Sequence, residues 1–142
     1  MYAYIFITHG NMGREILETA QKIMEEDLTD HCSVFSIDFS MAEKLDDIKA
    51  EIKGCLDCYL GKDRKVIIFV DLFGGSPSNV AYTIAKHENV DVVSGINLPM
   101  VMYSIEHLDS TKKLDEMVEG IMKSGAQNIT SAKKLLNRKV VK

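Results

Sequence analysis

Residues 65–70, KVIIFV, run directly into residues 71–79, DLFGGSPSN, and this junction decides how the 142-residue chain folds. The first segment is almost wholly apolar, which is typical of a central parallel strand covered on both faces. The glycines and serine that follow predict a turn and then a helix, with Ser76 as the N-cap and Pro77 at the first helical position. A polar turn therefore follows a buried strand.

The rest of the chain repeats this alternation of apolar strands and amphipathic helices. Short runs rich in β-branched and aromatic residues predict further strands over residues 2–8, 32–38 and 90–94. Helical periodicity predicts one helix from Met12, a second that follows a capping box of Ser40 and Glu43, and a third from Pro99. A further helix is predicted over 114–122, and Gly125 is expected to end it. This alternation predicts an α/β fold: an open, mainly parallel sheet of about four strands, order 2-1-3-4, with helices on both faces.

Length and composition indicate one globular domain over residues 1–142, with a core over 2–125 and a tail over 126–142. Hydrophobic residues make up 46% and charged residues 27% of the chain, the balance of an ordinary globular protein. The formal net charge of −4 argues against a general nucleic-acid binder, whose surface would be basic. Without an apolar span of about 20 residues or a secretion signal, the expected location is the cytoplasm.

His9 and Asp71 are polar residues that come immediately after two apolar strands. If those strands are neighbours, both side chains lie at the sheet edge where α/β proteins bind ligands. A carboxylate on one ring nitrogen would fix the imidazole tautomer and leave the other nitrogen as a nucleophile. A purely structural bond between His9 and Asp71 is the alternative.

Glycines around these two residues predict a cradle for an anion. Gly74, Gly75 and Ser76 precede a helix, and Gly10 precedes another, so backbone N–H groups and helix dipoles favour a phosphoryl group there. Ser76 has two alternative roles, capping the helix or donating its hydroxyl to a phosphoryl oxygen. The histidines and cysteines show no metal-ligand spacing, and no cofactor motif is present, so neither a metal nor a cofactor is expected.

Three further features have more than one interpretation. Asn97 is expected to fix a loop rather than contact a ligand. Met12, Phe73 and Met100 form either a docking rim around the site or part of the core. The CLDC motif at 55–58 lies near the end of a long helix rather than at an N-terminus, so its cysteines are predicted to pack rather than to act in redox chemistry.

Three segments, ITHGNMGREILETAQKI (7–23), VDLFGGSPSNVA (70–81) and VSGINLPM (93–100), together resemble the mannose-family IIA domains of the bacterial sugar phosphotransferase system. The resemblance extends over about residues 2–125. It implies that His9 is phosphorylated, that Asp71 is the partner of this histidine, and that Ser76 lies beside the phosphoryl group. No cofactor is implied.

The resemblance also implies partner proteins. The phosphocarrier HPr would donate the phosphoryl group to His9, and a IIB subunit would accept it for sugar uptake through membrane components IIC and IID. Family members are homodimers in which a C-terminal antiparallel strand, a fifth strand, is exchanged between copies. The chain departs from the pattern after Gly125, so the exchanged strand is uncertain, and the basic end KKLLNRKVVK is expected to be a solvated tail or edge element.

Two other functions are compatible with a reactive His9. A regulatory phosphocarrier would use the same phosphohistidine to control another protein without sugar transport. The THG motif also resembles the RHG motif of histidine phosphatases, but those enzymes surround the phosphate with arginines, and Thr8 stands where that arginine would be. The sugar cannot be read from this sequence in either case.

Overall fold

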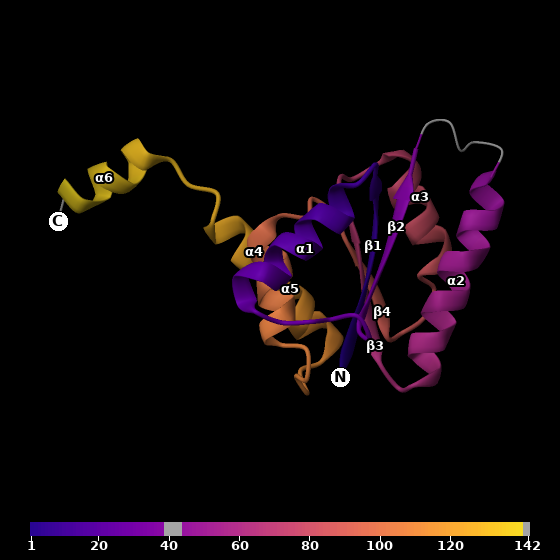
Figure 1. Ribbon diagram of the computed structural model, residues 1–142. Coiled ribbons are helices and arrows are strands. Elements are labelled where there is room, and N and C mark those ends of the chain that lie inside the picture. Colours follow the sequence, from indigo (N-terminus) through magenta and orange to yellow (C-terminus); the bar gives the residue numbers. More distant parts are fainter. Residues whose placement is uncertain (39–43, 141–142) are drawn as a thin grey trace.

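The computed structural model describes residues 1–38 and 44–140 and shows helices on both sides of a central sheet (Figure 1). The elements in chain order are β1 (Tyr2–His9), α1 (Met12–Met24), β2 (Cys32–Ile37), α2 (Leu45–Gly61), β3 (Lys65–Val70), α3 (Gly75–Ile84), β4 (Val90–Val93), α4 (Leu98–Glu106), α5 (Leu114–Gln127) and α6 (Ala132–Val140). The predicted capping box of Ser40 and Glu43 lies outside the described residues.

The sheet has four parallel strands in the order β2-β1-β3-β4. This confirms the predicted order and direction. β1 pairs with β3 from Tyr2 opposite Lys65 to Ile7 opposite Val70. The two most apolar strands are therefore neighbours, and both end at the same edge of the sheet.

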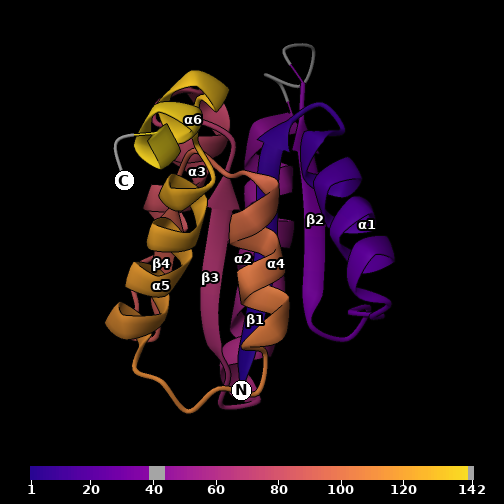
Figure 2. The same ribbon diagram turned by 90° about the vertical axis from the view of Figure 1, so that its left-hand side faces the viewer.

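Helices cover both faces of the sheet. α1, α4 and α5 lie against one face and α2 and α3 against the other (Figures 1 and 2). Alternate residues of β1 divide between two hydrophobic clusters: Tyr4 and Phe6 pack beneath α1, α4 and α5, whereas Ile5 and Ile7 pack beneath α2 and α3. Burial on both faces explains why β1 and β3 read as continuous apolar runs.

The start of α3 differs from the prediction. The helix begins at Gly75 with Gly74 as its N-cap, and no side chain caps it, so Ser76 is not the N-cap and Pro77 is not the first helical residue. Gly74 and Gly75 have φ values of 97° and 84°, a region that glycine enters readily. The pair thus lets the helix begin two residues earlier than predicted, and Pro77 still lies in the first turn, where a helix needs no N–H partner.

The end of α5 also differs from the prediction, because the helix continues past Gly125 to Gln127. A Cβ at Gly125 would lie 2.6 Å from Cγ of Met100, so this glycine permits close packing of α5 on α4 rather than ending the helix. Beyond it, residues 132–140 form a helix, α6, so no fifth strand is present in the described part of this single chain. The homodimer stays a prediction.

Candidate functional site

His9 and Asp71 meet at the carboxyl edge of the sheet, as the sequence predicts. Nδ1 of His9 lies 2.7 Å from Oδ2 of Asp71, and the backbone N–H of His9 donates to the same oxygen at 2.9 Å. The other carboxylate oxygen accepts the backbone N–H of Leu72 at 3.1 Å. The Asp71 side chain is 8% exposed and that of His9 is 32% exposed. Backbone N–H groups thus fix the buried carboxylate, while the imidazole is partly exposed to solvent.

The charge of Asp71 determines the tautomer of His9. Burial by itself would raise the pKa of Asp71, but the hydrogen bonds donated by the backbone and ring of His9 outweigh it and leave the pKa below its ordinary value. The carboxylate is therefore ionised at neutral pH and accepts hydrogen bonds only. Nδ1 must then carry the proton, and in the neutral ring Nε2 carries the lone pair.

Gly75 brings the first turn of α3 against the ring of His9. A Cβ at this glycine would lie 3.4 Å from Cε1 and 3.6 Å from Nε2 of the imidazole. The N–H groups in the first turn of a helix have no partner within the helix and favour an anion. The structure thus places Gly75 beside Cε1 and Nε2 of the ring, with Gly74 and the exposed Ser76 as its neighbours in the chain. Gly10, with φ of 52°, forms the turn that follows His9.

Thr8 is a positioning residue that the sequence analysis missed. Its side chain is fully buried, and its Oγ1 accepts the backbone N–H of Gly13 at 2.8 Å. Asn11, the N-cap of α1, makes no side-chain cap bond, so Thr8 caps this helix from the preceding strand. A Cβ at Gly13 would lie 3.1 Å from Oγ1 of Thr8. The bond between Thr8 and Gly13 therefore joins the two ends of the turn that carries His9.

Exposed apolar side chains lie close to His9 and Asp71 in the sequence. Phe73 is 80% exposed, and Leu72 and Met12 are also exposed. The ring of Phe73 contacts that of Tyr82 edge to face, with centroids 6.2 Å apart. Met100 is only 4% exposed and belongs to the core, so the rim consists of Met12 and Phe73, with Leu72 added.

The structure also places Asn97 and the cysteines of the CLDC motif. Oδ1 of Asn97 accepts the N–H of Met100 and its Nδ2 donates to the carbonyl of Gly125, which fixes the loop before α4. Cys55 and Cys58 lie in the second half of α2. Cys55 is half-buried and packs against the core beneath this helix, as predicted, whereas Cys58 is exposed, so the packing prediction is wrong for Cys58. Among the residues that the structure describes, no group of three or more His, Cys, Asp or Glu side chains is placed to hold a metal ion.

A family model described as the PTS system fructose IIA component matches residues 3–122. That match covers most of the chain, including His9, Asp71 and all four strands. The chain belongs to this family of phosphotransferase-system IIA components. It is a mannose-family member, as the sequence motifs predict.

Curated relatives agree with this assignment. The IIA chain is 28% identical over 132 residues to the mannose-specific EIIAB component of the phosphotransferase system in Escherichia coli K12, which covers 92% of this chain and 39% of that protein. It is 25% identical over 124 residues to the sorbose-specific EIIA component of Klebsiella pneumoniae, covering 87% and 86% of the two chains. The chain thus spans well under half of the mannose-specific relative.

Solved structures share the fold of the IIA chain. The IIA protein associated with the fucose utilization operon of Streptococcus pneumoniae superposes with a TM-score of 0.76 at 28% identity, over 95% of this chain and 96% of that one. The EIIA component of Streptococcus agalactiae superposes with a TM-score of 0.76 at 20% identity, over 94% and 99% of the two chains.

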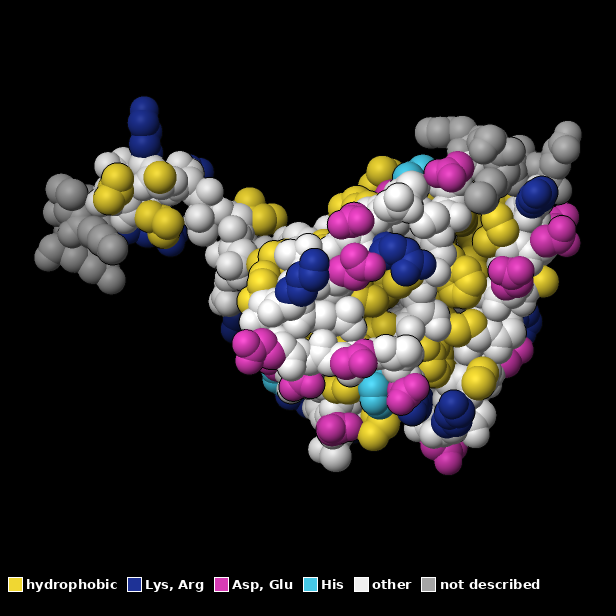
Figure 3. Space-filling model, viewed as in Figure 1, with side chains coloured by type: hydrophobic (Ala, Val, Ile, Leu, Met, Phe, Trp, Pro, Cys, Tyr) yellow, Lys and Arg dark blue, Asp and Glu magenta, His cyan; other side chains and the backbone are white. Residues whose placement is uncertain are grey.

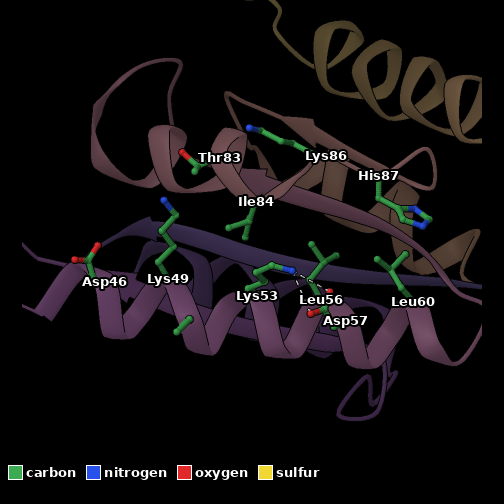
Figure 4. A pocket seen from close by; sticks show the side chains of 11 residues that line it. Asp46, Lys49, Lys53, Leu56, Asp57, Leu60, Thr83, Ile84, Lys86 and His87 are labelled. Carbon is green, nitrogen blue, oxygen red and sulfur yellow. Dashed lines mark hydrogen bonds and ion pairs between the residues drawn. The ribbon is translucent and has the colours of Figure 1, made fainter.

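The IIA chain also has a groove between α2 and α3, away from His9 (Figure 4). Its volume is about 520 Å³. Apolar side chains, including Leu56, Leu60 and Ile84, line its interior, with lysines such as Lys49 and Lys86 beside them. The described residues include no helix long and apolar enough to cross a membrane.

Proposed function

We propose that His9 accepts a phosphoryl group from phospho-HPr and passes it to a IIB component, in support of sugar uptake and phosphorylation. The hydrogen bond between Nδ1 of His9 and Oδ2 of Asp71 is the observation that carries this proposal. This bond keeps a proton on Nδ1, so the neutral form of the ring has its lone pair on Nε2, beside the first turn of α3. Imidazole is the side chain best suited to this task near neutral pH.

The transfer step exchanges one nitrogen–phosphorus bond for another. The Nε2 lone pair of His9 bonds to phosphorus while the bond to the donor nitrogen breaks, and that electron pair returns to the donor ring. A donor ring protonated on its second nitrogen leaves as neutral imidazole. The proton on Nδ1 of His9 stays in its bond to Asp71, which stabilises the positive charge that the phosphorylated ring acquires. Passage to the IIB component is the same step in the other direction.

The protein assists this step by position and electrostatics. Charge in the transition state lies on three phosphoryl oxygens, and the N–H groups around Gly74, Gly75 and Ser76 are placed to receive them. Gly10 offers a second turn on the His9 side. No metal ion or cofactor is part of this proposal.

The exposure of the site suits two protein partners in turn. The His9 side chain is 32% exposed, and the apolar side chains of Met12, Leu72 and Phe73, which are close to the site residues in the sequence, are exposed too. Interfaces between proteins are enriched in exposed aromatic and Met side chains of this kind. An enclosed pocket would bar a second protein from the phosphoryl group.

The test is intact-mass analysis after incubation with phosphoenolpyruvate, Enzyme I and HPr, alongside a His9→Ala variant. We expect a gain of one phosphoryl mass that is acid-labile and absent from the variant. No gain with demonstrably active HPr would overturn the phosphocarrier function. Transfer from the phosphorylated chain to a mannose-family IIB component then tests the sugar-uptake role, and phosphorylation without transfer to such an acceptor would favour a regulatory phosphocarrier.

A further inference from the structure

The groove between α2 and α3 has an apolar floor and lies away from His9 (Figure 4). Its floor belongs to the hydrophobic core beneath these helices: Leu56 is 2% exposed and Ile84 is 8% exposed. Leu60 is half-buried at one end of the groove. The carbon stems of the lysines that line the groove extend this apolar surface. An apolar body can therefore lie along the groove.

Cationic side chains gather at the other end of the groove. Lys49 extends from α2 and Lys86 from the residues after α3, and both ammonium groups point toward Thr83 (Figure 4). Lys53 pairs with Asp57, whereas in the described part of the chain neither of the other two lysines of the lining has an ion-pair partner. Two cations are thus available to a ligand at this end.

The charge of the groove is opposite in sign to that of the protein. The described lining holds three lysines and two aspartates, Asp46 and Asp57, so it is +1 with His87 neutral, whereas the whole chain is −4. On the face shown in Figure 3, by contrast, the basic side chains of the body lie among acidic ones. A local excess of positive charge beside an apolar floor is complementary to a ligand with an anionic head and an apolar body.

The groove is too narrow for a polypeptide. From Asp46 to Leu60 it follows α2 for about 21 Å, at about 1.5 Å per residue. Its volume of about 520 Å³ spread over this length gives a mean cross-section of about 25 Å². A helix with its side chains is about 10–12 Å across, and an extended strand needs about 5 Å by 10 Å. An unbranched hydrocarbon chain carries no side groups and is narrower than either.

We propose that the groove between α2 and α3 binds an amphipathic anion, an acyl carboxylate with an unbranched chain. The carboxylate lies between the ammonium groups of Lys49 and Lys86, and the chain runs along Ile84 and Leu56 to Leu60. The groove volume falls within the range of about 300–1,000 Å³ that is usual for small-molecule sites. This site is distinct from His9, so the inference goes beyond the proposed phosphoryl transfer and does not depend on it.

Three other occupants fit the groove less well. A sugar phosphate would match the lysines, but its hydroxyl groups would find no partner on the leucine and isoleucine floor. An extended peptide would leave its N–H and C=O groups unpaired there, because the walls are helices whose backbone groups are already bonded. Residues 128–142 of the chain itself carry five basic and no acidic side chains, so the lysines of the groove would repel them.

The test is isothermal titration calorimetry of the full chain with decanoate below its micelle concentration, alongside octanoate, decanol and inorganic phosphate. A double variant, Lys49→Gln with Lys86→Gln, is compared with a control variant, Lys22→Gln with Lys123→Gln. The control removes two exposed lysines from α1 and α5, on the other face of the sheet. Circular dichroism checks that each variant folds, and amide NMR shifts locate the bound ligand.

We expect saturable binding of decanoate, with amide shifts confined to α2, α3 and the residues beneath them. Decanoate should bind about tenfold more tightly than octanoate, because two further methylene groups are buried. The Lys49 and Lys86 variant should bind decanoate about five- to tenfold more weakly, since two charge contacts are lost, while the control variant keeps the affinity. Decanol should bind as weakly to the original protein as decanoate does to the double variant, and inorganic phosphate should not bind measurably.

Absence of saturable binding, equal weakening in the control variant, or decanol binding as tightly as decanoate would overturn the proposal. So would amide shifts that centre on His9 rather than on the groove. A different oligomeric state of the Lys49 and Lys86 variant in light scattering would also overturn it, because a second copy would then occupy the groove. Phosphoryl uptake from phospho-HPr is measured separately from these titrations, so failure of one proposal is distinguishable from failure of the other.

Discussion

The carboxyl edge of the sheet around His9 and the groove between α2 and α3 are two surfaces of opposite kind. The groove has a volume of about 520 Å³ and many polar side chains, but its acid–base contact is an exposed ion pair between Lys53 and Asp57. At the edge, the carboxylate of Asp71 is only 8% exposed and lies behind the imidazole of His9, which is 32% exposed.

The difference shows that a groove without a fixed reactive group is not the better candidate site. A small-molecule enzyme usually encloses its ligand, whereas a phosphoryl group handed between proteins must stay within reach of both. The edge combines a fixed tautomer, a helix N-terminus and an open approach. The groove has cations but no fixed nucleophile, so paired substitutions at the two surfaces test this comparison.

The largest difference is expected between Asp71→Asn at the edge and Asp57→Asn at the groove. The amide removes the charge that holds the proton on Nδ1 of His9, so phosphorylation should slow by about 100-fold or more. Asp57 lies in an exposed ion pair, and its variant should keep the rate of the original protein. Rapid-quench measurement of phosphoryl uptake from phospho-HPr gives both values, and equal rates for the two variants would break the comparison.

Threonine substitutions at the two surfaces should differ in how much they lower the stability of the protein. Thr8→Val leaves the buried N–H of Gly13 without its acceptor and should lower the free energy of unfolding by about 1–3 kcal/mol, whereas Thr8→Ser keeps the oxygen and most of the stability. At the groove, Oγ1 of the exposed Thr83 donates to the Asn79 carbonyl, and Thr83→Val should change stability by about 0.5 kcal/mol or less. Urea denaturation measures all three, and a Thr8→Val variant as stable as Thr83→Val would contradict the role of Thr8.

Glycine substitutions at the two surfaces should change the stability of the protein in opposite directions. Gly75→Ala places a side chain at φ of 84° and against the imidazole, so it should cost about 1–2 kcal/mol and slow phosphorylation. Gly54, within α2, has open space around its position for a Cβ, and Gly54→Ala should stabilise the protein by up to about 1 kcal/mol. Thermal unfolding of the two variants gives the signs, and stabilisation by Gly75→Ala would show that the turn before α3 is not constrained by its backbone.

The smallest expected effect is on acid stability. Because the pKa of Asp71 in the folded protein lies below its ordinary value of 3.8, the unfolded chain binds more protons as pH falls through that range, and stability falls with it. The contribution is complete above the ordinary carboxyl pKa and is lost below the folded one. Asp71→Asn should therefore differ most from the original protein near neutral pH and least at about pH 3. An equal difference in urea midpoint between Asp71→Asn and the original protein at both pH values would contradict this linkage.

The sequence by itself determined the strands, their parallel order and the two residues that meet at the sheet edge. These are local and periodic features: doubly buried strands must be apolar throughout, and short crossovers place successive carboxyl ends at one edge. The motifs around His9 and Asp71 also determined the family. Asn97 was identified correctly as a loop residue because its type favours turns.

Only the tertiary structure decided what the small residues do. The sequence predicted that Gly125 ends a helix, but this glycine accommodates Met100 in the packing of α5 on α4. The sequence indicated no structural role for Thr8, but its Oγ1 accepts the N–H of Gly13. α3 begins at Gly75 rather than at the predicted Pro77, because positive φ values at Gly74 and Gly75 change the path of the turn. Each outcome depends on a contact between separate elements or on a backbone angle, and neither is encoded in local periodicity.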